Sequence, residues 1–166
     1  MANWLKYVIA FTASFALMLA FRTFAFSIHG VTGDGLEPTY QSGDRLLINR
    51  CSYGLRIEGN ALLPYSRLMR QPVEKGDIVA FSMPGDSIEG LMIARCAAVP
   101  GDTIRTPKGL ITIPGLRSCA KNDYYWLEAL NSSNPIDSRN LGCIPENNIV
   151  GRVVTVLYNR NNSFLP

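Results

Sequence analysis

A continuous apolar segment occupies the start of the chain and sets it apart from everything that follows. Residues 5–21 are apolar except for Lys6 and a few small hydroxyl side chains, and Arg22 follows directly. A helix needs about 20 apolar residues to cross a bilayer. Residues 1–26 therefore predict an N-terminal transmembrane helix, whose Lys6 and Arg22 extend their cationic groups toward opposite interfaces.

Two other interpretations of this segment remain open. A cleavable signal peptide needs small residues just before its cut site, and Thr23-Phe24-Ala25 matches that requirement poorly. A buried core helix of a soluble domain normally has a polar face, whereas this run is apolar on every face. A retained membrane anchor fits the pattern better than either alternative.

Beyond residue 26 the pattern changes to short apolar runs separated by glycine and proline, which is typical of β-strands. No stretch of ten residues there has the 3.6-residue period of a helix. The predicted strands are residues 45–49, 77–81, 91–99, 102–105 with 110–113 as a hairpin, 124–127 and 149–158. Residues 53–72 are polar and irregular and predict a loop. Residues 27–166 therefore predict one β domain, bent so that its sheet edges are protected.

Charge narrows the classes of partner. The net charge is +3, and the lysine and arginine residues are scattered along the chain. Nucleic-acid binding normally requires clustered basic residues, so no nucleic-acid partner is expected.

The cysteines indicate neither a metal site nor a redox site. Cys51, Cys96, Cys119 and Cys143 show no Cys-x-x-Cys spacing, and no cofactor is expected. If the domain lies outside the cytoplasm, Cys119 and Cys143 flank one polar loop and are the pair that we expect a disulfide to join. The alternative, in which all four are small buried side chains, stays open.

Four segments resemble, in order, the signature boxes of bacterial signal peptidase I. The family patterns are S-G-S-M-x-P-T followed by G-D, then K-G-D-I, then K-R-V-x-x-x-P-G-D, and finally S-x-D-S-R-x-x-G. The corresponding segments are residues 33–44, 75–81, 93–102 and 135–152. The resemblance covers nearly the whole chain. It implies a domain of strongly bent antiparallel sheets of the signal peptidase I type. It also implies that the N-terminal helix anchors this domain to the cell membrane and that the domain lies on the extracytoplasmic side.

The same resemblance implies that the catalytic groups are missing. Signal peptidase I uses a serine nucleophile and a lysine base, which must be desolvated to be neutral. Gly35 stands at the nucleophile position and Ala94 at the base position. Gly33 replaces a serine of the oxyanion hole, and Pro135 replaces the serine that orients the lysine. Neither glycine nor alanine carries a reactive atom, so the resemblance implies a member that is inactive.

Other family positions are retained, and we expect these residues to support the sheet around the site. They are Pro38, Asp44, Arg95, Asp102, Asp137, Ser138 and Arg139. Arg95 and Asp137 are candidates for an ion pair. Cys96 lies two residues after Ala94, and with His29 it is the one candidate for a replacement dyad. A buried structural cysteine and a surface histidine are the simpler interpretation.

Three functions are consistent with this pattern. The first is an inactive domain that holds signal peptides, or exported or lipid-anchored proteins, by strand addition. The second is an active signal peptidase I that cleaves exported preproteins. The third is a structural subunit of a membrane assembly, with a partner subunit that the sequence does not identify.

Overall fold

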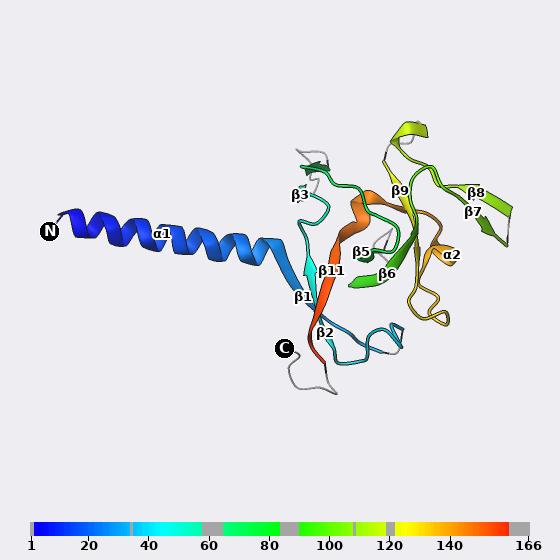
Figure 1. Cartoon of the computed structure of the whole chain (residues 1–166), viewed down its shortest axis with the longest axis horizontal. Coiled ribbons are helices and arrows are strands. Elements are labelled where there is room, and N and C mark those ends of the chain that lie inside the picture. The colour runs from blue at the N-terminus through cyan, green and yellow to red at the C-terminus, as the bar shows by residue number, and fades with distance from the viewer. Residues whose placement is uncertain are drawn as a thin grey trace.

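The computed structural model consists of an N-terminal helix followed by a β domain (Figure 1). It describes residues 2–33, 35–57, 65–83, 90–107, 109–118 and 122–159. The helices are α1 (Ala2–Ala25) and α2 (Ser138–Leu141), with 3-10 turns at Leu116–Ser118 and Glu146–Asn148. The strands are β1 (Phe26–Gly30), β2 (Arg45–Asn49), β3 (Leu55–Ile57), β4 (Ser66–Leu68), β5 (Ile78–Ser82), β6 (Leu91–Ala98), β7 (Thr103–Thr106), β8 (Gly109–Thr112), β9 (Tyr124–Glu128), β10 (Ile144–Pro145) and β11 (Ile149–Tyr158).

Most of these strands belong to one curled antiparallel sheet. Within the described residues its strand order is β1-β2-β11-β5-β6-β9-β10, and β3-β4 and β7-β8 form separate hairpins. The long strand β11 changes register against both of its neighbours, and β6 does so against β9. Such irregularities bend a strand and increase its twist. The predicted mostly β fold with strongly bent antiparallel sheets is therefore confirmed.

The longer strands lie where the apolar runs predicted them. Strands β2 and β11 have the predicted bounds, and β5 to β9 differ from theirs by at most one residue at each end. The prediction of a loop over 53–72 was wrong, because β3 and β4 pair through Leu55 and Leu68. Residues 58–64 of that range lie outside the described residues. Strands of three residues are too short to show a period of two, so no sequence pattern indicated this hairpin.

The core lies on both faces of the central strands. On β5, Val79 and Phe81 belong to one buried cluster and Ala80 belongs to another. On β6, Ala94 shares the first cluster with Val79, whereas Ile93 shares the second cluster with Ala80. Alternate side chains of a strand point to opposite faces, which explains why these runs are apolar without interruption.

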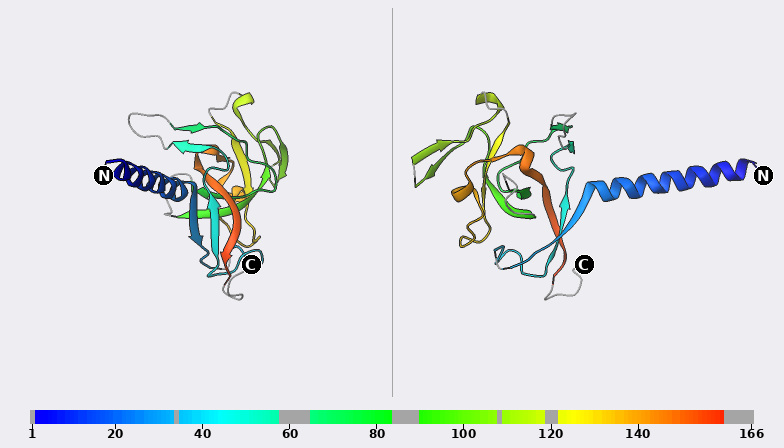
Figure 2. Two further views of the ribbon diagram at one scale, coloured as in Figure 1. Left: turned by 60° about the vertical axis from the view of Figure 1, so that its left-hand side comes forward. Right: turned by 180° about the vertical axis from the view of Figure 1, so that it is seen from behind.

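Helix α1 projects away from the β domain in the views of Figures 1 and 2. Its apolar side chains are exposed, including those of Trp4, Phe11 and Leu17. Strand β1 begins at Phe26, immediately after the helix ends, and the predicted domain boundary at this point stays a prediction. In the part of the chain that the structure describes, no helix reaches both the length and the apolarity of a membrane span.

Candidate functional site

A groove of about 440 Å³ lies where the first and fourth signature segments meet strand β6. One wall comes from β1 and the residues after it, including His29, and the other wall comes from the first residues of β6. The apolar lining residues are Val31, Leu36, Leu91, Met92, Ile93 and Ile136. Thr32, Gly90, Gly35 and Asn134 complete the lining, so the nucleophile position of the resemblance lies within the groove.

Gly35 is covered by the side chain of Asn134. A Cβ atom added at Gly35 would lie 2.7 Å from Asn134 Nδ2 and 3.4 Å from its Cγ. The Asn134 amide donates a hydrogen bond to the Gly35 carbonyl oxygen at 3.2 Å. A side chain at position 35 would therefore require the Asn134 carboxamide, the end of a flexible side chain, to move aside.

Gly33 is constrained by its backbone and has open space around it. Its φ angle of 76° lies in the left-handed region, which residues other than glycine adopt at a cost of about 1 kcal/mol. No atom of the described structure lies within 4 Å of a Cβ atom added there. A serine at position 33 would thus be disfavoured by local conformation, while its Cβ atom would have open space.

Ala94 is fully buried on the face of β6 that packs against Val79, Phe81 and Leu127. Ala94 is not among the residues that line the groove: Ile93 faces the groove, and alternate side chains of β6 point to opposite faces. The methyl group of Ala94 therefore points into the apolar core, away from the groove that contains Gly35. This cluster would desolvate an amine, as a neutral lysine requires. The methyl group of alanine supplies packing only.

The fourth segment is held in place through Asp137, which is fully buried. Its carboxylate accepts hydrogen bonds from Arg139 Nε at 2.6 Å and from the Arg139 backbone N–H at 2.9 Å. Asp137 therefore forms an ion pair with Arg139. The expected ion pair between Asp137 and Arg95 is not formed in the described part of the structure. Ser138 is also buried, and its Oγ accepts a hydrogen bond from the Leu127 N–H at 2.9 Å. These contacts attach the loop that carries Asn134 and Pro135 to strand β9.

Of the other retained residues, Arg95 is exposed on strand β6, and Pro38, Asp44 and Asp102 lie in turns. Asp44 is buried and accepts a hydrogen bond from the Gln41 N–H at 2.9 Å. Asp102 accepts one from the Val99 N–H at 2.8 Å and pairs with Lys75 at 2.9 Å, and these contacts lower its pKa. Pro38 is exposed in the turn after Gly35. Their structure is consistent with the supporting role that the resemblance implies.

Cys96 and His29 do not form a replacement dyad in this structure. Cys96 is buried in the same cluster as Ala94, and burial raises the pKa of its thiol to about 12. A thiol with such a pKa is protonated at neutral pH and is a poor nucleophile. His29 lies apart from that cluster, in the wall of the groove.

The described cysteines, Cys51, Cys96 and Cys143, carry free thiols. Cys119, the predicted disulfide partner of Cys143, lies outside the described residues. Among the side chains that the structure describes, no group of three His, Cys, Asp or Glu residues is arranged to hold a metal ion.

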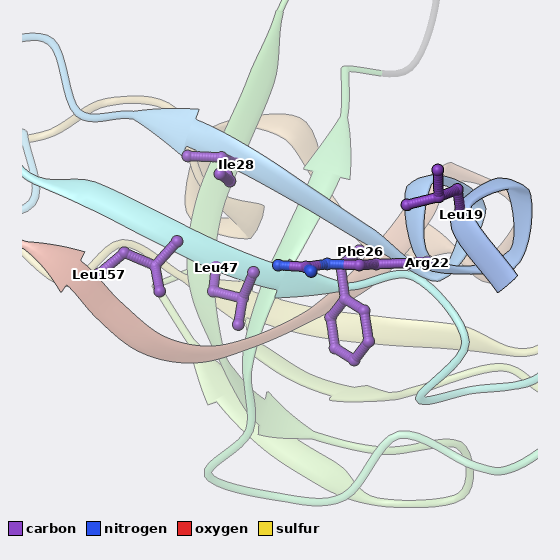
Figure 3. Close-up of a pocket in the computed structure, with 6 residues that line it drawn as sticks. All are labelled: Leu19, Arg22, Phe26, Ile28, Leu47 and Leu157. Carbon is purple, nitrogen blue, oxygen red and sulfur yellow. The ribbon is translucent and has the colours of Figure 1, made fainter. Parts of the chain in front are cut away.

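A second hollow, of about 610 Å³, lies on the outer face of the sheet beside the end of α1 (Figure 3). Its lining is apolar except for one cation, and consists of Leu19, Arg22, Phe26, Ile28, Leu47 and Leu157. Ile28 and Leu47 are directly paired across β1 and β2, so their side chains share one face. This hollow offers an apolar surface and contains no nucleophile.

Sequence reasoning alone did not identify Asn134, His29, Leu36 and Ile136 as lining the groove. Their signal was positional, since Asn134 and Ile136 flank Pro135 in the fourth segment, and Leu36 follows Gly35. Only His29 is of a residue type that indicates chemistry, and the sequence offered it as a partner of Cys96, not as a wall of the groove.

Comparison with known proteins shows what the chain is similar to. Residues 2–121 match a family model described as signal peptidase, peptidase S26. A probable signal peptidase I-2 of Synechocystis sp. is 26% identical, over 90% of this chain and 71% of that protein. The signal peptidase I of Leptolyngbya laminosa is also 26% identical, over 85% and 73%. The signal peptidase I of Pseudomonas aeruginosa is 27% identical over 55% of this chain and 31% of that protein.

Proposed function

Because the chain belongs to the peptidase S26 family of signal peptidases, we propose that it is an inactive member that binds signal peptides without cutting them. The observation that carries this proposal is the position of Asn134, whose amide nitrogen lies 2.7 Å from where the Cβ atom of residue 35 would be. A serine peptidase needs a hydroxyl at its nucleophile position and a base beside it. Gly35 and the buried Ala94 provide neither.

Two free strand edges support the binding part of the proposal. Strand β1 is an edge of the described sheet, and it leads directly into one wall of the groove. On β6, pairing with β9 begins at Arg95, so residues 91–94 have a main-chain edge that no described strand occupies. An extended peptide can pair with such edges through its own backbone while its small side chains enter shallow pockets. Binding of this kind requires no catalytic group.

The location that fits this role is a membrane. The apolar run at residues 5–21 and the exposed side chains of α1 support an anchor that crosses the membrane once, with the β domain on the extracytoplasmic side. The apolar hollow beside Arg22 continues this surface onto the sheet (Figure 3). The proposed ligands are the signal peptides of exported or lipid-anchored proteins, which lie at the same surface.

The direct test incubates the full chain, in detergent micelles, with a preprotein whose signal peptide ends in Ala-x-Ala. We expect saturable binding by fluorescence anisotropy and no cleavage product on gels. The signal peptidase I of Leptolyngbya laminosa, assayed in parallel, shows that the substrate can be cut. A peptide with Arg in place of both alanines is the matched negative ligand.

Each outcome decides one part of the proposal. Cleavage by the wild-type chain overturns the proposed inactivity and leaves an active peptidase. Absence of binding, with intact substrate and folded protein, overturns peptide capture and favours a structural subunit. Binding of both peptides with equal affinity shows that the groove does not select small side chains.

A further inference from the structure

Asn134 is oriented by two hydrogen bonds in such a way that one of its amide hydrogens remains available. The Ile136 N–H can only donate, so the atom that it contacts at 3.0 Å is the carbonyl oxygen Oδ1. The other end of the carboxamide, Nδ2, donates to the Gly35 carbonyl oxygen at 3.2 Å. A carboxamide nitrogen has two hydrogens, and within the described residues the second has no partner.

The surroundings of this amide identify the chemistry of its missing partner. Asn134 is half-buried in the groove, whose walls are mostly apolar side chains such as Leu36, Ile93 and Ile136. A peptide entering such a groove brings a carbonyl oxygen at every residue, and each one that is buried without a donor costs free energy. A donor fixed in the groove compensates for one of these carbonyls.

We propose that Asn134 binds one main-chain carbonyl oxygen of the captured peptide, at the place where catalytic relatives present their nucleophile. This inference rests on the proposed function, since it requires a peptide in the groove. The same side chain thus has two effects. It fills the space beside Gly35, and it offers a neutral donor that holds a peptide bond without attacking it.

The test compares Asn134→Asp with the wild-type full chain in the anisotropy assay with the Ala-x-Ala peptide. Aspartate keeps the shape and the acceptor for Ile136, but removes both donors and places an anion near the peptide carbonyls. We expect affinity to fall about tenfold. The matched control is Asn140→Asp, which removes an amide donor to the Pro135 carbonyl oxygen in the same loop but lies in a different hollow. This control is expected to change affinity less than about twofold.

A second measurement separates a contact with the peptide from a structural effect of the substitution. Peptides in which successive carbonyl oxygens are replaced by sulfur, a weaker acceptor, are titrated against both proteins. We expect sulfur at one position of the peptide to weaken binding to the wild type and to leave binding to Asn134→Asp unchanged. The difference between the two proteins at that position measures the coupling.

The outcomes distinguish this inference from the proposed function. If the wild type does not bind the peptide, both fail together. If the wild type binds and Asn134→Asp binds equally well, peptide capture stands and the role of Asn134 is refuted. If Asn134→Asp binds weakly but every thioamide has the same effect on both proteins, Asn134 acts on loop structure and the inference is again refuted.

Discussion

Gly35, which lines the groove, and Gly33, two residues before it, differ in what they would allow a side chain to do. At Gly35 the obstacle is a neighbour, because Asn134 Nδ2 lies within 2.7 Å of an added Cβ atom. At Gly33 the obstacle is the backbone, whose φ of 76° suits glycine. Ala94 differs from both, since its methyl group is packed against Val79 and Phe81 in a fully buried cluster.

These local constraints predict how hard it is to restore peptidase activity. Gly35→Ser combined with Ala94→Lys supplies the two reactive atoms, yet the serine meets Asn134, and the lysine enters a packed core at a cost of about 1–3 kcal/mol. We expect turnover of a preprotein to remain undetectable. Adding Gly33→Ser, Pro135→Ser and Asn134→Ala is expected to raise turnover to at least about 100-fold above the detection limit through orientation of the new groups.

The measurement is the rate of product formation on gels, with circular dichroism to confirm that each variant is folded. The single Asn134→Ala change is the control, since it opens the space without adding a reactive atom. Appreciable turnover from Gly35→Ser with Ala94→Lys alone would show that the orienting groups at positions 33 and 135 are not required.

At the scale of elements, the hairpin β3–β4 is held to the sheet by a buried arginine. The side chain of Arg67 is only 3% exposed, and its Nη2 donates to the Ile149 carbonyl oxygen at 2.6 Å. Its Nε lies 3.9 Å from Glu146, which also accepts a hydrogen bond from Arg70 Nε at 2.8 Å. The hairpin is therefore attached to the start of β11 by buried charge and by very little apolar surface.

This attachment predicts that Arg67 contributes more to stability than an ordinary surface arginine. Arg67→Ala removes the donor to the Ile149 carbonyl oxygen, whereas Glu146 keeps Arg70 as its partner, and we expect the free energy of unfolding to fall by about 2 kcal/mol. Arg105→Ala on the exposed β7–β8 hairpin is the matched control and is expected to cost at most about 0.5 kcal/mol. Urea unfolding followed by tryptophan fluorescence measures both values. An equal fall in the free energy of unfolding in both variants would show that the buried contacts of Arg67 stabilise the protein no more than an exposed arginine does.

At the scale of the whole molecule, apolar surface is concentrated at the end of the chain that carries α1. The helix exposes Phe11, Phe15 and Leu17, and the outer face of the sheet beside it exposes Phe26 and Ile28. Figures 1 and 2 show that α1 extends away from the domain, so the domain itself covers little of this surface. Exposed apolar area of this kind indicates contact with a membrane or a partner.

The proposed anchor is tested by flotation of the full chain with lipid vesicles. Phe11→Lys combined with Phe15→Lys places two charges in the middle of α1, and we expect the vesicle-bound fraction to fall at least about tenfold. The control, Leu68→Lys combined with Leu110→Lys, makes the same change at two exposed leucines of the β hairpins and is expected to leave flotation unchanged. If both double variants float equally, α1 does not attach the chain to the membrane.

The sequence alone determined the family, the mostly β fold and the position of the longer strands. Runs such as 45–49 and 149–158 are long enough to show a strand pattern, and the four segments are ordered along the chain like those of the family. These signals are local, because they depend on residue type and on spacing within a short range. The sequence could therefore also show that Gly35 and Ala94, which carry no reactive group, stand at the nucleophile and base positions of the resemblance.

Only the tertiary structure decided what surrounds those positions. Asn134 reaches Gly35 from a loop 99 residues away in the chain, and no local pattern encodes that contact. The hairpin fixed by Arg67 and the burial of Cys96 among Tyr53, Leu127 and Ile144 likewise depend on which segments the curled sheet brings together. Contacts between distant segments follow from packing of the whole domain, which a single sequence does not specify residue by residue.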